Sequence, residues 1–244
     1  CLSIVELLAV LYFQEMNIDP AQPKMPGRDR LVCSKGHAGP AVYATLANRG
    51  YFDKKELLTL NQGGTNLPSH CDMNLTTGID MTTGSLGQGF SCAVGVALGS
   101  KLEDDGATVY AIVGDGESQE GQVWEAAMFA ASKGLGNLVG FTDYNKLQID
   151  GTVAQVNDIA PLADKWAAFG WNVIDVADGN DVEQVSAAVK QAKANRATGR
   201  PTMVILNTLK GCGVKWIEEM GAGNHNTNVS EEQAKAAIAE IREG

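Results

Sequence analysis

The chain has 244 residues, 44% of them hydrophobic, which is enough for one large α/β domain with a substantial core. Its formal net charge of −10 leaves no basic surface for a phosphodiester backbone, so the composition argues against nucleic-acid binding and favours small molecules and proteins as partners. The 5 cysteines form no C-x-x-C pair, which argues against a zinc site or a disulfide framework. Their spacing indicates a reducing, cytoplasmic compartment.

The first apolar segment predicts a helix that docks on the rest of the domain. Its apolar side chains recur at helical spacing from Ile4 to Tyr12, and the prolines within 20–26 then predict an extended connection. Because this segment contains Glu6 and has no basic flank, it fits neither a signal peptide nor a membrane span. The sequence starts without Met and inside this predicted helix, so we expect further residues upstream of Cys1.

A strand, a polar turn and two helices are predicted before a long loop. Residues 30–33 predict a short strand, and the turn Ser34-Lys35-Gly36-His37 precedes helices predicted over 41–48 and 54–60. Residues 61–83 are rich in Gly, Thr, Asn and Pro and lack apolar periodicity. Long loops of this kind inside compact domains are usually functional or disordered.

From residue 93 onward the pattern becomes regular. A run of small residues over 93–100 predicts a buried helix packed closely against another backbone, and apolar strands then alternate with helices. Such alternation implies right-handed crossovers and a parallel sheet covered on both faces. We therefore predict one three-layer α/β domain over residues 1–244, with a mostly parallel sheet and helices on both faces. The predicted strands are 107–113, 138–142, 172–176 and 202–207, and the helices are 120–132, 159–169, 182–194 and a tail helix with Ser230 and Gln233 at capping-box spacing.

Two hard oxygen ligands follow neighbouring predicted strands. Gly114-Asp115-Gly116 comes directly after the strand 107–113, and Asn145 lies just beyond the next strand. Ligands of open α/β sheets bind outside the carboxyl ends of the strands, where loops from neighbouring strands meet. A carboxylate and a side-chain carbonyl suit Mg²⁺ or Ca²⁺, and the flanking glycines let a diphosphate reach the backbone. The sequence thus predicts a metal and phosphate site here.

These residues resemble the Mg²⁺–thiamine diphosphate motif of thiamine-dependent enzymes, in which residues 117–144 would separate the Gly-Asp-Gly turn from the asparagine. The flanking sequence is similar, more narrowly, to the N-terminal, diphosphate-binding half of transketolases, from about residue 4 to 208. The resemblance implies the thiamine diphosphate-binding fold. It rests on an ordered set of motifs: Ser34-Lys35-Gly36-His37, Leu67-Pro68-Ser69-His70, Met81-Thr82-Thr83-Gly84-Ser85-Leu86-Gly87-Gln88-Gly89, Gly114-Asp115-Gly116-Glu117-Ser118-Gln119-Glu120-Gly121 and Ile149-Asp150-Gly151.

The resemblance assigns roles residue by residue. Asp115, Asn145 and the Leu147 carbonyl would hold Mg²⁺, and Ca²⁺ is an alternative ion. The remaining cofactor contacts would be Gly116 at the diphosphate, Gly84 and Leu86 against the aminopyrimidine, Ile149 near the thiazolium, and Glu120 in an acidic network that links the two active sites of a dimer.

Histidines supply the expected substrate chemistry. The resemblance places His37 and His70 along the cofactor and substrate channel and His225 at the diphosphate and the donor oxygens. Imidazole suits these roles because its pKa allows proton transfer near neutral pH. The context Gly223-Asn224-His225-Asn226 departs from the Trp-His-Gly-like context of the family, which puts the alignment of His225 in question. We expect Lys35 to be a solvated surface lysine, whereas Lys210 follows a strand at the ligand edge.

The resemblance also implies that half of the active site lies in another polypeptide segment. In the family, the glutamate that activates the pyrimidine ring and the arginines that bind the sugar phosphate belong to a separate pyrimidine-binding domain. The chain would therefore be the N-terminal subunit of a split transketolase or a fragment of a longer enzyme. The capped helix over 230–244 favours the split form.

The resemblance further implies a place in pentose phosphate metabolism and a set of partners. These are sugar phosphate substrates, a C-terminal subunit, and a second copy of this chain within a heterotetramer. The helix near 93–99 is a candidate contact surface, and the helix face formed by Trp124, Met128 and Phe129 is expected to belong to the core or to an interface. Two alternatives stay open: half of another thiamine enzyme, such as a deoxyxylulose-phosphate or dihydroxyacetone synthase, and a non-catalytic cofactor-binding or scaffold subunit.

Overall fold

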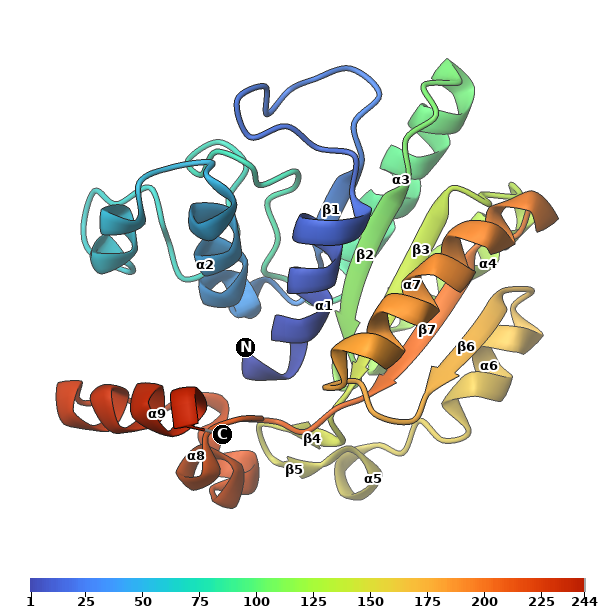
Figure 1. Ribbon diagram of the computed structural model, residues 1–244. Helices are drawn as coiled ribbons and strands as arrows, with labels where there is room; N and C mark the ends of the chain where they lie inside the picture. Colours follow the sequence, from blue (N-terminus) through green and yellow to red (C-terminus); the bar gives the residue numbers. More distant parts are fainter. Residues whose placement is uncertain (244) are drawn as a thin grey trace.

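Five parallel strands form the central sheet of the computed structural model, which describes residues 1–243 (Figure 1). The strands are apolar along almost their whole length, as expected of strands buried on both faces. Their order across the sheet is β1 (Arg30–Cys33), β2 (Val109–Gly114), β3 (Leu138–Tyr144), β7 (Thr202–Asn207) and β6 (Asn172–Val176).

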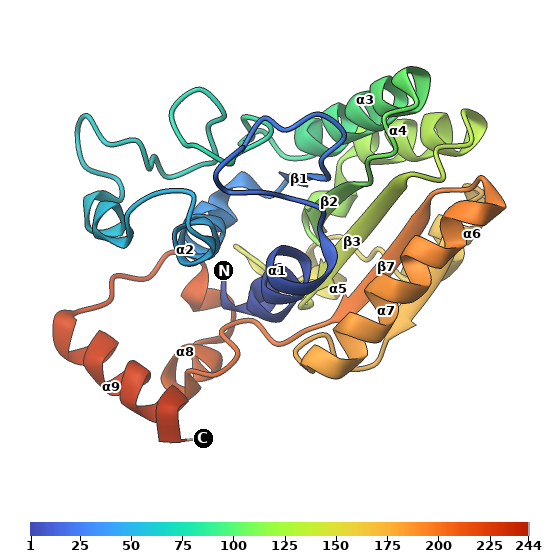
Figure 2. The ribbon, with the colours of Figure 1, turned by 45° about the horizontal axis from the view of Figure 1, so that its top comes forward.

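Helices cover both faces of this sheet (Figure 2). One face carries α1 (Val5–Val10) and α7 (Val182–Asn195), and α2 (Gly39–Arg49) packs against α1. The other face carries α3 (Gln88–Glu103), α4 (Gly121–Ser132) and α6 (Leu162–Ala168). The predicted three-layer α/β architecture is confirmed.

Several element boundaries differ from the prediction. The N-terminal helix is divided into a 3₁₀ turn (Leu2–Ile4), α1 and a π turn (Leu11–Glu15), and Lys54–Thr59 forms a 3₁₀ helix instead of an α-helix. Strand β3 continues past the predicted end at residue 142 to Tyr144. Its extension carries the completely buried Asp143 into the sheet, where Gly114 of β2 is its register partner.

Short elements that the sequence did not predict follow the strand ends. A hairpin joins β4 (Leu147–Gln148) to β5 (Gly151–Thr152), with α5 (Val153–Val156) after it, and α8 (Lys215–Glu219) follows β7. Four further 3₁₀ turns are Gly36–Ala38, Glu117–Gln119, Arg196–Thr198 and Gly221–His225. The tail helix α9 (Glu231–Glu243) has the predicted reciprocal capping bonds between Ser230 and Gln233.

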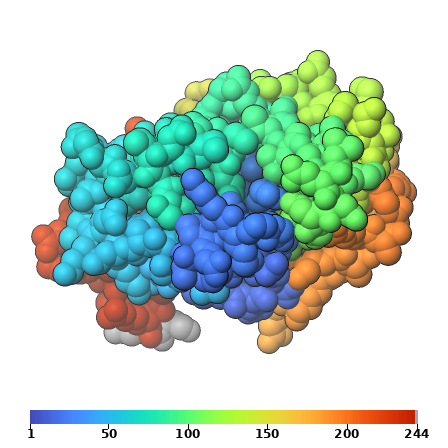
Figure 3. Space-filling view, turned by 90° about the horizontal axis from the view of Figure 1, so that it is seen from above, coloured from blue at the N-terminus to red at the C-terminus, as the bar shows by residue number. Residues whose placement is uncertain are grey.

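The long loop 61–83 contains no helix or strand. The view from above shows the first third of the chain, coloured blue to teal, beside the part built by α3 to α7 (Figure 3). Among the described helices, none is both long and apolar enough to cross a membrane.

Candidate active site

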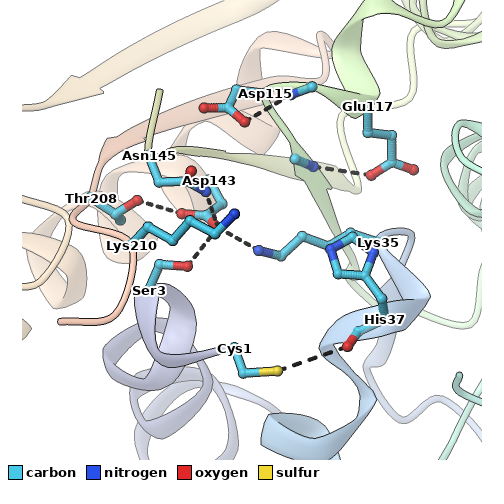
Figure 4. A network of polar contacts seen from close by, with 12 residues as sticks. Cys1, Ser3, Lys35, His37, Asp115, Glu117, Asp143, Asn145, Thr208 and Lys210 are labelled. Carbon is cyan, nitrogen blue, oxygen red and sulfur yellow. Dashed lines mark hydrogen bonds and ion pairs between the residues drawn. The ribbon is translucent and has the colours of Figure 1, made fainter. Parts of the chain in front are cut away.

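The carboxyl ends of β1, β2, β3 and β7 bring the polar residues of the candidate site together (Figure 4). The turn after β1 supplies Lys35 and His37, and the end of β2 supplies Asp115. The end of β3 supplies Asp143 and Asn145. Parallel strands place these segments at one edge of the sheet, the lower edge in Figure 1, as the sequence predicted.

Asp115 is a buried carboxylate that receives backbone donors. Its side chain is 2% exposed, Oδ1 accepts the Gly116 N–H at 2.7 Å, and Oδ2 accepts the N–H of Lys146. Burial and then the charge of Asp143 raise the pKa of Asp115 to about 6. A carboxylate has about four acceptor positions, so both oxygens keep a lone pair for a further partner.

Asp143 is the centre of a buried network that the sequence did not predict. Its Oδ2 accepts the Ser3 hydroxyl at 2.8 Å, the Asn145 side-chain amide at 3.0 Å and the ammonium of Lys35, and its Oδ1 accepts the Thr208 hydroxyl. Burial alone would raise its pKa, but Lys35 and the hydroxyls lower the pKa of Asp143 to about 2. A charged residue at the end of an apolar strand, two positions before Asn145, was the available signal.

The expectation that Lys35 is a solvated lysine is wrong. Lys35 is buried and forms an ion pair with Asp143, because the turn after β1 points it at the end of β3 (Figure 4). Burial by itself would lower its pKa, but the Asp143 carboxylate raises the pKa of Lys35 above the usual value.

Asn145 sits where the chain leaves β3 and enters the β4–β5 hairpin. Its Nδ2 donates to Asp143 and its Oδ1 accepts the Leu147 N–H at 3.1 Å. Lys146, between Asn145 and Leu147 in the chain, adopts a φ of 66°, which directs its N–H to Asp115. Asp115, Asn145 and Leu147, the three predicted metal ligands, are thus connected by hydrogen bonds through the backbone 145–147.

Glu117 is a second buried carboxylate that the sequence did not single out. Its Oε1 accepts the Ser34 hydroxyl and the Gly87 N–H at 2.8 Å, and its Oε2 accepts the Gly114 N–H at 3.0 Å. Burial raises the pKa of Glu117, and the three donors oppose that shift. The residue ties the ends of β1 and β2 to the loop before α3.

The three histidines lie in loops around this edge. The rings of His37 and His225 lie 5.2 Å apart, and the Lys210 ammonium is 3.2 Å from Nδ1 of His225. Partial burial lowers the pKa of both rings, followed by the charge of Lys35 at His37 and of Lys210 at His225. Each ring therefore favours its neutral form more than a free imidazole does.

His70 lies beside Gly84, where a Cβ would stand 3.6 Å from the ring Cδ2. A Cβ on Gly36 would stand only 2.7 Å from the Thr83 Oγ1, so Thr83 fills the space beside Gly36. The loops that carry His37 and His70 therefore meet at 83–84.

The other predicted cofactor contacts differ in how far they are exposed to solvent. A Cβ on Gly116 would approach the Gln148 Cβ at 3.2 Å, and the Leu86 carbonyl accepts the Gln122 amide at 2.8 Å. Ile149 is 66% exposed at the tip of the hairpin. Glu120 is exposed at the N-cap of α4, and its side chain has no hydrogen bond to another described residue.

The donor set fits a hard divalent cation. Three buried carboxylates, Asp115, Glu117 and Asp143, stand at this edge with the buried ammonium of Lys35. Asp115 has no cationic hydrogen-bond partner among the described residues. Within the same residues no group of three His, Cys, Asp or Glu side chains is placed to hold a metal ion, so a cation beside Asp115 would also depend on amide and backbone carbonyl oxygens. An oxygen-only site with a free carboxylate is what Mg²⁺ prefers.

A family model described as "Transketolase, thiamine diphosphate binding domain" matches residues 1–241. The chain belongs to the transketolase family. The predicted resemblance and fold are therefore confirmed, and the family supports thiamine diphosphate as the cofactor.

Relatives in this family include separate transketolase subunits. The "6-deoxy-6-sulfo-D-fructose transketolase subunit SqwG" of Clostridium sp. (strain MSTE9) is 57% identical over 240 residues, which are 98% of this chain and 86% of the relative. One of the subunits of the apulose-4-phosphate transketolase of Phocaeicola vulgatus is 36% identical over 242 residues, covering 99% of this chain and 84% of the relative. These names favour the split form over the alternatives.

Solved transketolases share the fold of this chain. The transketolase of Campylobacter jejuni superimposes with a TM-score of 0.87 at 29% identity and matches 97% of this chain but 37% of its own. The chain therefore spans about two fifths of the transketolases of known structure.

Proposed function

We propose that this chain is the N-terminal subunit of a split, thiamine diphosphate-dependent transketolase. Together with a C-terminal pyrimidine-binding subunit, it transfers a two-carbon ketol unit between sugars. The observation that carries this proposal is the buried Asp115 carboxylate, which keeps free lone pairs beside Asn145 at the ligand edge of the sheet. Membership of the transketolase family supports the reaction class.

Asp115, Asn145 and the Leu147 carbonyl would hold Mg²⁺, and Gly116 would leave room for the diphosphate. Gly84, Leu86 and Ile149 would border the rings of the cofactor. When bound, thiamine diphosphate supplies the carbon nucleophile and the electron sink that ketol transfer needs.

The histidines would act on the sugar. A neutral imidazole can accept a proton at one ring nitrogen and donate from the other. Partial burial, and then the charges of Lys35 and Lys210, lower the pKa of His37 and of His225, which favours this form. They would orient the donor hydroxyls and move protons at the donor oxygens, with His70 completing the channel.

The donor sugar is proposed from the relative with 57% identity, whose name gives 6-deoxy-6-sulfo-D-fructose. We propose the same donor for the assembled enzyme. A comparison of 6-deoxy-6-sulfo-D-fructose with fructose 6-phosphate as donors tests this choice. A higher kcat/KM for the phosphate sugar would reject the sulfonated donor and retain the transketolase reaction.

The proposed assembly is a homodimer of this chain within a heterotetramer in the cytoplasm. Relatives named as subunits support a second chain, and Glu120 would join the two copies of the active site. We expect the isolated chain to bind the cofactor weakly and to have no turnover, since part of the active site would come from the second chain.

Calorimetry with thiamine diphosphate and Mg²⁺, on this chain assembled with its partner subunit, tests the proposed function. We expect a binding heat that requires Asp115 and is lost in Asp115→Ala. The matched control is Asp164→Ala, which removes an exposed aspartate from the first turn of α6. A heat that survives Asp115→Ala would contradict the proposed site, as would full ketol transfer by the chain alone.

A further inference from the structure

We propose that Asp143 is the positioning residue of the metal site: it fixes the side chain of Asn145 so that the amide oxygen faces the cation. The inference rests on the proposed function, because it assigns a role relative to the proposed Mg²⁺ ligands. Asp143 is not one of those ligands. Its position, completely buried at the end of β3, gives it access to Asn145 and to the turn after β1.

Asp143 already accepts about as many hydrogen bonds as a carboxylate can hold. Its two oxygens accept four hydrogen bonds, one from Thr208 at Oδ1 and three at Oδ2 from Ser3, Lys35 and Asn145. Since a carboxylate offers about four acceptor positions, this side chain is saturated by protein donors. Asp115 receives two hydrogen bonds from the described residues and keeps its remaining capacity. Asp115 can therefore bind a metal, whereas the Asp143 carboxylate is occupied by protein donors.

The hydrogen bonds fix the orientation of the Asn145 amide without ambiguity. The Leu147 N–H can only donate, and it points at Oδ1 at 3.1 Å. Both Asp143 oxygens take hydrogen bonds from side-chain donors, and Oδ2 faces Nδ2 at 3.0 Å. A carbonyl oxygen has two lone pairs, so Oδ1 keeps one for a metal after the bond from Leu147. Without the carboxylate, the Leu147 N–H would be the one remaining hydrogen bond among the described residues that opposes a turn of the NH₂ toward the cation.

Asp143 is itself held by donors from three other segments. Ser3 belongs to the N-terminal 3₁₀ turn, Lys35 to the turn after β1, and Thr208 follows β7. With donors from three separate segments, the carboxylate should keep its place beside Asn145 when one of them is lost, and it orients the amide as outer hydrogen bonds orient ligands in other metal sites.

A double-mutant cycle on the chain assembled with its partner subunit tests this role. The measurement is the Mg²⁺ dissociation constant from calorimetry at saturating thiamine diphosphate. We expect Asp143→Asn to weaken Mg²⁺ binding roughly 10- to 100-fold, the range found for residues that orient metal ligands. In an Asn145→Ala background the same change should have no further effect, because the amide through which Asp143 acts is absent.

A second readout separates positioning from structural support. Mg²⁺ requires near-ideal octahedral geometry and Ca²⁺ accepts irregular sites, so a released Asn145 should weaken Mg²⁺ binding more than Ca²⁺ binding. Thr208→Val and Ser3→Ala are the controls, since each removes one donor to Asp143 but keeps its contact with Asn145. These controls should lower the melting temperature and leave Mg²⁺ affinity and the Mg²⁺/Ca²⁺ ratio within about twofold of wild type.

Should Asp143→Asn fail to fold, the pair Lys35→Met and Asp143→Leu replaces the buried ion pair by apolar side chains, which is often tolerated. The same cycle with Asn145→Ala is then measured in that background. Equal losses of Mg²⁺ affinity with and without Asn145 would overturn the inference, since Asp143 would then act by its charge alone. An unchanged Mg²⁺ affinity in Asp143→Asn would also overturn it. A wild-type enzyme that binds no metal would reject the proposed function together with the inference.

Discussion

At the scale of single residues, two neighbouring aspartates show how surroundings set opposite behaviour. Asp115 and Asp143 lie at the ends of adjacent strands, and the Asp115 N–H donates to the Asp143 carbonyl at 3.2 Å. Lys35 and the hydroxyls hold the pKa of Asp143 at about 2, whereas burial beside a like charge raises the pKa of Asp115 to about 6. Donors within the chain compensate the charge of the Asp143 carboxylate, and the Asp115 carboxylate is left for an external cation.

The raised pKa of Asp115 predicts a pH-dependent stability in the absence of metal. The folded state binds this proton more tightly than the unfolded state, so its contribution is fully present below the unfolded pKa of 3.8 and is lost as the pH rises through about 6. In EDTA, Asp115→Asn should therefore be more stable than wild type at pH 7, by roughly 2–3 kcal/mol at most. The difference should disappear near pH 4.

Urea denaturation at pH 4, 5.5 and 7 measures this difference. Addition of Mg²⁺ and thiamine diphosphate with the partner subunit should reverse the order at pH 7, because the cation stabilises only the ionised wild-type side chain. Equal stability of the two proteins at pH 7 in EDTA would show that Asp115 is already compensated within the chain.

Residues at the ends of predicted strands could be assigned from the sequence, and their neighbours could not. Asp115 and Asn145 each follow an apolar strand, so their meeting at one edge depends only on a parallel sheet. Lys35 and Glu117 obtain their roles from partners that are distant in sequence, namely Asp143 for Lys35 and Gly87 for Glu117. No local pattern encodes those partners, and the prediction of a solvated Lys35 was wrong for that reason.

At the scale of elements, helix α3 contains glycines with opposite surroundings. Gly89 lies at the start of the helix, where a Cβ would stand 2.7 Å from the Ser34 Cα and 2.8 Å from the Thr83 Cγ2. Gly95 is exposed in the middle of the helix, and nothing lies within 4 Å of its Cβ position. The first glycine lets α3 approach the turn after β1, and the second has no such function within the chain.

The same substitution should therefore have opposite effects at the two positions. Gly89→Ala should destabilise the chain by about 1–3 kcal/mol, since backbone atoms of another element would have to move. Gly95→Ala should stabilise it by about 0.5–1 kcal/mol through the higher helix propensity of alanine. Thermal and urea unfolding at concentrations where the chain is monomeric measures both effects. A destabilising Gly95→Ala under these conditions would contradict the open surroundings of that residue.

Elements with long apolar runs were predictable, and short ones were not. The strands β2, β3, β6 and β7 follow from runs of apolar residues whose burial needs no knowledge of the partner. The hairpin β4–β5 has two residues per strand and is held by contacts of its surroundings, such as the bond from Lys146 to Asp115. Strands of two residues are too short for an alternating apolar pattern to be recognised in the sequence.

At the scale of the whole molecule, α3 and α4 lie side by side (Figure 2). On α4, Met128 is 59% exposed and Phe129 is 42% exposed, whereas Trp124 is half-buried and packs against the core. On α3, Gly95 and Gly99 have open space at their Cβ positions. Exposed helical glycines cost stability unless another backbone approaches them closely, so this surface is where we expect the second copy of the proposed homodimer.

Self-association of the chain should accordingly depend on this surface. Met128→Glu combined with Phe129→Glu should shift the chain from dimer to monomer in sedimentation velocity, because each apolar side chain that stays exposed forgoes about 1.5–3 kcal/mol of burial. The matched control is Leu58→Glu on the 3₁₀ helix Lys54–Thr59, where the side chain is 79% exposed away from α3 and α4. The control should remain dimeric. If the double variant sediments like wild type while Leu58→Glu dissociates, the dimer contact lies on the α2 side of the molecule, and α3 and α4 face solvent or the partner subunit instead.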